Sequence, residues 1–432
     1  MKRGKDLDHD RRDALSLIGL GGLMLAGAPG QAQPVRGGDP LADAQAAYDR
    51  HAAMALSLML ARPECADPRI RAQAYYTLSS LRAGVHAFHV APRQQHPRVY
   101  RETIWGPFES PWGGPASDFV YSWLFLDGRN SYRITGRRGT TRFADMQVFT
   151  GYFANPAMRG ISAMEVDAIE KSKDGNLLIM ASATPQPGNW LKLDAGEHEI
   201  VVQIRDAFYD WAGEEPLHLE IETIGKAADD LILSPDVLAQ RIEASGRLIE
   251  QTVHKAIAST DRCRKDAGGD NAFGFRDGRA NANGGASPRA GYSVMAWNVK
   301  PDDALIIEFP EPKARYWSIQ LVELWWNTLD FTYHQSGLNG IQARKDDDGM
   351  YRCVLSHVDP GVPNWLDPVQ TVQGQAFFRT YDGALAGAPT VTLCKVSEVR
   401  KLLPKSTPTV SPAERTANLA ARARASLMRW RP

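Results

Sequence analysis

The chain has 432 residues, in which 50 lysines and arginines balance 50 aspartates and glutamates to a formal net charge of zero. Hydrophobic residues make up 43% and charged residues 23%, which is typical of globular proteins and excludes extensive disorder. The length predicts two or three domains, the lack of a basic excess argues against nucleic acid as the main partner, and no apolar run beyond the N-terminal region is long enough for a transmembrane segment in the mature chain.

The first 32 residues have the parts of an export signal. A polar head carries Arg11 and Arg12, an apolar stretch runs from Leu15 to Ala28, and small residues precede a cut after Ala32. The adjacent arginines favour the twin-arginine route. We therefore expect a periplasmic or secreted protein, and the alternative is an N-terminal anchor that is never cleaved.

An oxidising compartment would permit disulfides among the four cysteines. They contain no Cys-x-x-Cys pair, so a zinc site has no support and no metal is expected. Cys65 and Cys263 fall in predicted helical regions, whereas Cys353 and Cys394 fall in predicted strands of one module. These placements lead to the hypothesis of one or two disulfides, each within one of these pairs.

The rest of the chain alternates between helical and strand-rich regions. We expect a helical N-terminal region over 33–100, a first β module over 101–225, a helix with a Gly/Asn-rich linker over 226–290, a second β module over 291–397 and a basic C-terminal helix over 398–432. Ser234-Pro235 starts the middle helix, and the capping box Ser411–Glu414 starts the last one. The predicted fold is mainly β with flanking helices (α+β), with two related β-sandwich or jelly-roll-like modules joined by a helical segment.

The two β modules share four landmarks in the same order, which indicates an internal repeat. The landmarks include the turns Asp174-Gly175 and Asp348-Gly349, the pairs Asn189-Trp190 and Asn364-Trp365, and the later arginines Arg205 and Arg379. Residues common to both copies most simply build the fold. Function is therefore sought in what one copy has and the other lacks.

With the Asp-Gly turns aligned, His357 of the second copy replaces Ala183 of the first, and Asp359 follows two residues later. One interpretation is a buried histidine whose ring is satisfied by a backbone carbonyl. The other is that His357 and Asp359 are catalytic, with the imidazole projecting into a cavity and moving a proton.

The second copy also places aromatic rings beside amide and hydroxyl groups, which suits polar ligands with apolar faces, sugars among them. The candidate ligand-binding residues are Trp325, Trp326, Asn327, Tyr333, His334, Asn339, Asn364, Asp367 and Arg379. If Trp325 and Trp326 lie in a strand, they point to opposite sides, so one of them lies at a module interface or a binding surface. Asp367 and Arg379 either form a structural ion pair or bind a substrate carboxylate or hydroxyl.

Several strings in the second copy resemble the family called domain of unknown function 1214. They are Ala304–Glu308, Tyr316–Leu321, Ser336–Gly340 and Asp359–Asp367, the last reading Asp-Pro-Gly-Val-Pro-Asn-Trp-Leu-Asp. The resemblance is strongest over about 284–415, and a weaker similarity extends back to about 100. One departure is that a Gly-His pair often follows the last string in the family, where this chain has Gln370-Thr371. The resemblance implies a β-sandwich or jelly-roll C-terminal domain, and it supplies no reaction and no cofactor.

The leading hypothesis is an exported protein that binds a polar small molecule or a carbohydrate in the second β module. One alternative is a hydrolase or lyase acting on glycosides or related compounds, with His357 as acid/base, and another is a non-catalytic structural or assembly protein. From Glu398 onward the tail holds eight basic and two acidic residues, whereas residues 33–397 carry 37 basic and 44 acidic ones. We expect this basic tail to pack on the acidic body.

Overall fold

The computed structural model describes residues 38–91, 97–101, 111–151, 158–225, 234–276 and 287–430. The export signal expected over residues 1–32 lies outside these residues. The elements below belong to one compact unit, Pro40–Pro432. None of the helices in the described ranges combines the length and the apolarity that a membrane span requires.

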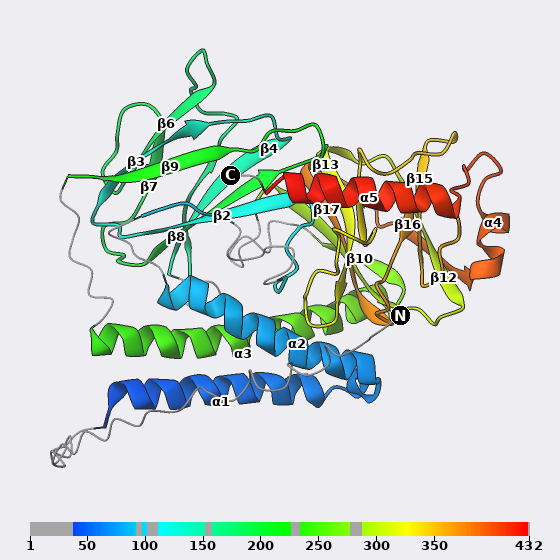
Figure 1. The fold of residues 1–432 in the computed structure, drawn as a ribbon, viewed down its shortest axis with the longest axis horizontal. Helices are drawn as coiled ribbons and strands as arrows, with labels where there is room; N and C mark the ends of the chain where they lie inside the picture. Colours follow the sequence, from blue (N-terminus) through cyan, green and yellow to red (C-terminus); the bar gives the residue numbers. More distant parts are fainter. Residues whose placement is uncertain are drawn as a thin grey trace, which may run out of the picture. The chain divides into compact units, whose positions relative to one another are not determined.

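The first module is a β-sandwich of two sheets (Figure 1). Its five-stranded sheet has the order β1 (Tyr100–Arg101), β2 (Phe119–Leu126), β8 (Ile200–Ala207), β4 (Phe143–Thr150) and β5 (Gly160–Glu165). Its four-stranded sheet has the order β7 (Trp190–Lys192), β6 (Asn176–Ser182), β3 (Ser131–Arg137) and β9 (His218–Ile224). Apolar side chains that alternate along the strands, such as Leu124, Ile134 and Val202, fill the space between the sheets.

The second module repeats this arrangement. Its five-stranded sheet has the order β10 (Ala272–Arg276), β11 (Ala290–Asn298), β17 (Gln373–Ala384), β13 (Lys313–Glu323) and β14 (Gly337–Asn339). Its four-stranded sheet has the order β16 (Trp365–Leu366), β15 (Met350–Ser356), β12 (Asp303–Pro310) and β18 (Thr390–Lys395). Each strand thus has a counterpart in the first module, and even the parallel pair β6–β7 recurs as β15–β16.

The repeated asparagine and tryptophan residues make the same hydrogen bonds in both copies. The Asn189 amide donates to two backbone carbonyls of the first module, at 2.8 and 2.9 Å, and the Asn364 amide does the same in the second, at 2.7 and 3.1 Å. The Trp190 indole donates to the Ser182 carbonyl at 3.0 Å, and the Trp365 indole to the Ser356 carbonyl at 2.9 Å. These matched bonds support the internal repeat predicted from the sequence.

Helices flank the two modules. They are α1 (Pro40–Leu60), η1 (Pro63–Ala66), α2 (Pro68–Val85), η2 (His86–Val90), α3 (Pro235–Ala267), η4 (Val396–Glu398), α4 (Val399–Leu402) and α5 (Pro412–Met428). In Figure 1, α1, α2 and α3 lie together beneath the sheets. Gly246 allows α3 to approach α1 closely, because a Cβ atom there would lie 2.7 Å from the Cα atom of Tyr48.

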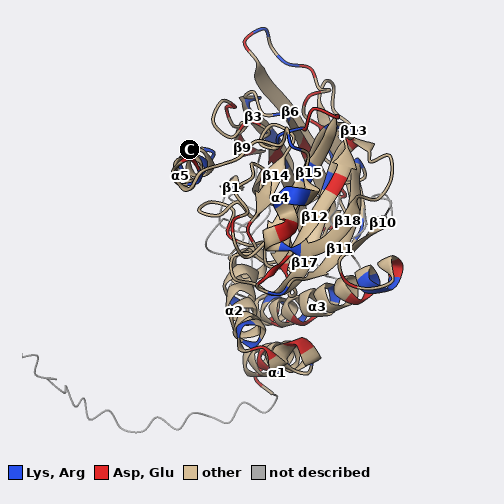
Figure 2. Ribbon diagram, turned by 90° about the vertical axis from the view of Figure 1, so that its right-hand side faces the viewer, with Lys and Arg blue, Asp and Glu red and all other residues tan. Residues whose placement is uncertain are grey.

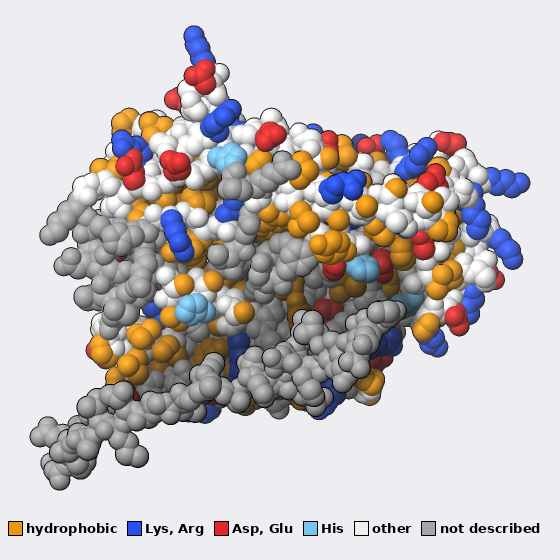
Figure 3. Space-filling model, in the orientation of Figure 1, with side chains coloured by type: hydrophobic (Ala, Val, Ile, Leu, Met, Phe, Trp, Pro, Cys, Tyr) orange, Lys and Arg blue, Asp and Glu red, His pale blue; other side chains and the backbone are white. Residues whose placement is uncertain are grey.

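Within the basic tail, α5 starts at the predicted Ser411 capping box, runs along the second module and ends beside the first (Figure 1). Figure 2 shows α5 end-on, well away from α1. Arg415, near its start, contacts Asp359 of the second module at 2.8 Å. Arg429, at its end, donates to the Ser117 carbonyl at 2.7 Å and stacks on Trp211 of the first module at 3.9 Å. The tail therefore packs on the body through buried arginines. On the face seen in Figure 3, basic and acidic side chains are interspersed.

The two modules also contact each other directly through an aromatic and ionic interface. The rings of Phe143 and Tyr381 stack with centroids 4.1 Å apart. Arg315 of the second module bonds Glu165 at 2.8 Å and Asp167 at 2.7 Å in the first. The five-stranded sheets thus share a mixed core that fixes one module on the other.

No disulfide joins the four cysteines, all of which lie in described residues, so the disulfide hypothesis is wrong in this structure. Cys353 and Cys394 lie on β15 and β18, which pair with opposite edges of β12. Two strands so separated are about 9.5 Å apart, which exceeds the ~7 Å limit for a disulfide. The Cys65 thiol instead donates to the Met59 carbonyl at 3.2 Å.

Candidate ligand-binding site

The tryptophan pair expected in a strand lies in a turn, which corrects that expectation. β13 ends at Glu323, and Trp326 has a left-handed φ of 70°. Trp325 is buried against α2, where its indole nitrogen lies 3.4 Å from the Ile70 carbonyl, and the Asn327 amide donates to the Thr77 hydroxyl at 2.5 Å. The structure therefore places Trp325 and Asn327 in the contact between α2 and the second module.

Other predicted ligand residues are also engaged with the protein itself. The Asn339 amide donates to Asp118 at 2.8 Å and to the Tyr209 carbonyl at 3.0 Å, across the boundary between the modules. His357 Nε2 lies 3.0 Å from the Val299 carbonyl, in line with the backbone-satisfied interpretation. Asp359 bonds Arg415, so His357 and Asp359 are not partners of each other.

His334 and Asp367 are the two predicted ligand residues that the structure brings together. His334 Nδ1 lies 2.7 Å from Asp367 Oδ2, and the neighbouring Tyr333 is exposed. The predicted ion pair between Asp367 and Arg379 does not form. Just beyond Asp367, Val369 and Gln370 have left-handed φ values of 50° and 63°. Glycine adopts such angles without strain, whereas this chain has valine and glutamine there.

The predicted residues therefore do not line one common pocket. They are spread over the contact between α2 and the second module, the boundary between the two modules, the surroundings of α5 and the interior of the second module. Within the described ranges, no group of three or more His, Cys, Asp or Glu side chains is placed to hold a metal ion. A pocket large enough for a small molecule lies among the described residues of the first module.

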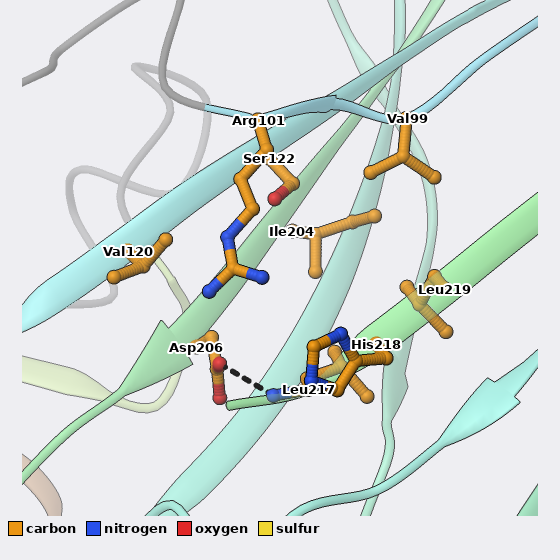
Figure 4. Close-up of a pocket in the computed structure, with 9 residues that line it drawn as sticks. All are labelled: Val99, Arg101, Val120, Ser122, Ile204, Asp206, Leu217, His218 and Leu219. Atoms are coloured by element: carbon orange, nitrogen blue, oxygen red, sulfur yellow. Dashed lines mark hydrogen bonds between the residues drawn. The ribbon is translucent and has the colours of Figure 1, made fainter. Parts of the chain in front are cut away.

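This pocket lies between the two sheets of the first module and has a volume of about 200 Å³ (Figure 4). It opens where the edge strand β1, the inner faces of β2 and β8, and the start of β9 come together. The lining residues are Val99, Arg101, Val120, Ser122, Ile204, Asp206, Leu217, His218 and Leu219. Apolar walls with a few convergent polar groups are typical of small-molecule sites.

Asp206 is the buried acid of the pocket. The Leu217 amide donates to Oδ2 at 2.8 Å and the Thr141 hydroxyl to Oδ1 at 2.5 Å. Burial raises the pKa of Asp206 to about 6, although these two hydrogen bonds and the charges of Arg138 and Arg101 oppose the rise. Because a carboxylate offers about four acceptor positions, Asp206 keeps capacity for a ligand.

Arg101 and His218 complete the polar side of the pocket. In Figure 4 the guanidinium of Arg101 points toward the carboxylate of Asp206. Its Nη2 also donates to the Arg429 carbonyl at the end of α5, at 2.9 Å. His218 is exposed and lies at the solvent side, whereas Ser122 is buried. A cation, an anion and two neutral hydrogen-bonding groups thus converge on one small space.

At the strand positions equivalent to Asp206 and Ser122, the second module has no acidic side chain. Thr380 stands in place of Asp206, and its hydroxyl donates to the Gly383 carbonyl at 3.1 Å. Ser293 stands in place of Ser122 and donates to the Gly274 carbonyl at 2.9 Å. Sequence reasoning missed this site because it compared the copies only for what the second one adds. The sequence difference that marks this site lies next to the aligned arginines, because aspartate follows Arg205 whereas threonine follows Arg379.

This geometry defines a class of protein: an α+β chain whose two β-sandwich modules are copies of one fold. A family model described as Protein of unknown function (DUF1214) matches residues 124–207 and 298–384, one stretch in each module. The match supports the family resemblance, which is strong in the second copy and weaker back to about residue 100.

A solved structure agrees with this fold. An uncharacterized protein from Burkholderia cenocepacia is 26% identical, with a TM-score of 0.73 over 83% of this chain and 97% of that one. The VPA0106 protein from Vibrio parahaemolyticus is 11% identical, with a TM-score of 0.41 over 74% of this chain and 98% of that one. The comparison with curated proteins found no match. The predicted fold class is confirmed, and the reported similarities name no ligand or reaction.

Proposed function

We propose that the protein binds a small neutral molecule bearing hydroxyl groups, in the pocket of the first module. The observation that carries this proposal is that Arg101 and Asp206 face the same cavity, whose lining also includes Ser122, His218 and apolar side chains. A ligand hydroxyl donates to Asp206 and accepts from Arg101, while the ring or chain that bears it packs on Val120 and Ile204. The sequence favoured a polar ligand in the second module, and the geometry moves the proposed site to the first.

The charge and size of the pocket narrow the ligand class. Arg101 and Asp206 carry opposite charges at neutral pH, so the site as a whole favours neither an anion nor a cation. A cavity of about 150 Å³ is known to hold benzene, so about 200 Å³ suits a molecule of single-ring size. A single sugar ring or a cyclic polyol therefore fits better than an oligosaccharide.

We expect Asp206→Asn to weaken binding of such a ligand at least about tenfold, because the substitution keeps the shape but removes the charged acceptor. Binding to the unaltered protein should weaken as the pH falls below about 6, where Asp206 gains its proton. Calorimetric titration with monosaccharides and cyclitols at pH 5 and pH 7.5 measures both effects.

The matched control is Asp194→Asn, which changes a half-exposed carboxylate of the same module that is paired with Arg159 at 2.6 Å. It should leave affinity unchanged. If no neutral hydroxylated compound of single-ring size binds, or if Asp206→Asn binds as tightly as the unaltered chain, the proposed site is wrong.

Export is a second part of the proposal, and it rests on the sequence of residues 1–32. In a bacterial host with a twin-arginine pathway, the exported chain should begin at Gln33. Replacing both Arg11 and Arg12 with lysine should hold the full-length chain in the cytoplasm. N-terminal sequencing of fractionated cells measures this. Export of the double variant with the same cut would refute the route, and a chain that keeps Met1 would refute the cleavable signal.

A further inference from the structure

Two arginines at equivalent positions of the repeats lie on the outer faces of the five-stranded sheets. Arg205 on β8 is opposite Tyr121 of β2 and Asp145 of β4. Arg379 on β17 is likewise opposite a tyrosine and a polar residue. These are Tyr292 of β11 and Ser318 of β13. The two copies thus differ at one of three matched positions, where aspartate in the first is serine in the second.

The two arginine sites lie close together at the boundary between the modules. Charge on both Arg205 and Arg379 lowers the pKa of the Tyr121 hydroxyl, against the larger opposing effect of its burial. Tyr292 of the second module in turn raises the pKa of Arg205. One buried polar centre therefore contains a guanidinium group from each repeat.

The first guanidinium has its own counter-ion. Arg205 bonds Asp145 Oδ1 at 3.1 Å and Gln147 Oε1 at 3.0 Å. The other oxygen of Asp145 accepts from the Tyr381 hydroxyl at 2.5 Å. Asp145 thus neutralises the charge of Arg205 within the protein.

The second guanidinium has only neutral partners among the described residues. Arg379 is 5% exposed, and it donates to Gln320 Oε1 at 3.0 Å and to the Gly114 carbonyl at 2.5 Å. No ion pair joins it to a described carboxylate. A buried charge is costly without an opposite charge nearby, and two of the five guanidinium N–H groups suffice for its present bonds.

Ser318 gives an independent indication at the same place. Its side chain is 1% exposed, and no well-formed hydrogen bond joins its hydroxyl to another described residue. The Tyr316 hydroxyl donates to Asp118 at 2.6 Å, and the approach of the Ser318 hydroxyl to the Tyr316 oxygen lowers the pKa of Tyr316. A buried donor and a buried cation therefore stand where the first repeat has an aspartate and an arginine.

We propose that Arg379 and Ser318 bind the carboxylate of a small organic acid, which takes the role that Asp145 has in the first repeat. The guanidinium donates two hydrogen bonds to the carboxylate and the Ser318 hydroxyl donates one. Tyr292, whose ring lies 5.9 Å from the Arg379 guanidinium, is only partly buried. The rest of the acid therefore extends along this ring toward solvent.

The test uses sodium acetate, benzoate and succinate as probes, with benzamide as the neutral counterpart of benzoate. At least one carboxylate should raise the melting temperature and give a saturable calorimetric signal, and benzamide should give neither. Arg379→Gln should weaken binding of that carboxylate at least about tenfold. Ser318→Asp should raise the melting temperature without a probe and abolish the response, because the chain then carries its own carboxylate.

Arg159→Gln is the matched control, since Arg159 is a half-exposed arginine paired with Asp194, and it should respond like the unaltered chain. Asp206→Asn should also keep the carboxylate response, which separates this site from the proposed pocket of the first module. The proposal fails if none of the three carboxylates binds, or if Arg379→Gln binds as well as the unaltered chain. If Ser318→Asp does not fold, the proposal is judged by carboxylate binding to the unaltered chain and to Arg379→Gln.

Discussion

Replacing Glu323 with glutamine should stabilise the protein by about 3 kcal/mol at pH 7 and by less than about 1 kcal/mol at pH 5. Burial raises the pKa of Glu323 from 4.5 to about 8, so the folded protein holds the acid form at neutral pH. The unfolded chain releases that proton above pH 4.5, which favours unfolding. Glutamine has nearly the same shape and has no proton to release. Urea denaturation of both proteins from pH 5 to pH 9 measures the difference.

The surroundings of Glu323 explain the size of this effect. Glu323 lies at the end of β13 beneath α2, and no ion pair joins it to a described cation. The backbone N–H of Asn327 donates to Oε1 at 2.9 Å, whereas Oε2 and the Asn327 side-chain oxygen make no well-formed hydrogen bond with the described residues. The Asn327 and Thr77 side chains approach Glu323 and lower its pKa, against the larger effect of burial. The titratable groups that face it, Cys65 of η1 and Tyr76 of α2, are neutral at pH 7 and contribute no positive charge.

The sign of the pH dependence follows from the two states. Below pH 4.5 both states carry the proton, and the free energy of unfolding is not reduced. Between pH 4.5 and about 8 it falls by about 1.4 kcal/mol for each pH unit, and above pH 8 the loss is complete. Comparing the two proteins at each pH cancels the other titrating groups. Parallel stability curves for Glu323→Gln and the unaltered chain would contradict the expected protonation.

Asp118→Ala should destabilise the protein by about 4 kcal/mol. Asp118 accepts from the Trp211 indole at 2.7 Å, the Asn339 amide at 2.8 Å and the Tyr316 hydroxyl at 2.6 Å. Alanine leaves these three buried donors unpaired and removes a negative charge near Arg429. Denaturant titration at pH 7 measures the loss of stability.

Asp118→Asn is the matched comparison, because it keeps one oxygen that can accept from Trp211 and Asn339. Asp118→Asn should therefore lower the free energy of unfolding clearly less than Asp118→Ala does. Asp210→Ala, at an exposed position of the same module, should change stability by less than about 0.5 kcal/mol. Equal stability of Asp118→Ala and the unaltered chain would show that this network does not hold the modules together.

The internal repeat and the helix starts could be predicted from the sequence because their causes are local. Turn glycines, capping residues and strand periodicity depend on neighbours a few residues away, and they gave the two modules and the starts of α3 and α5. The roles of Asn189 and Asn364 could also be predicted, since both copies have asparagine at nearly the same distance from the preceding Asp-Gly turn, 15 residues in the first and 16 in the second.

The site residues depended on contacts that no local pattern encodes. Trp325 was read as part of a strand, but β13 ends at Glu323 and the indole is buried by α2, about 250 residues earlier in the sequence. Asn339 is held by Asp118, 221 residues away. Arg101 and Asp206 come together only because β1 and β8 both pair with β2. Long-range strand order places these groups, and composition and spacing do not specify it.

The contacts of α5 determine how late in synthesis the first module can complete its packing. Trp211 belongs to the module made first, yet the guanidinium that stacks on it is that of Arg429, which is made only after the second module. The backbone carbonyl of Arg429 is also the partner of Arg101, which is made more than 300 residues earlier. The first module therefore gains these contacts only after the second module and α5 have been made, and a chain cut before Arg429 lacks them.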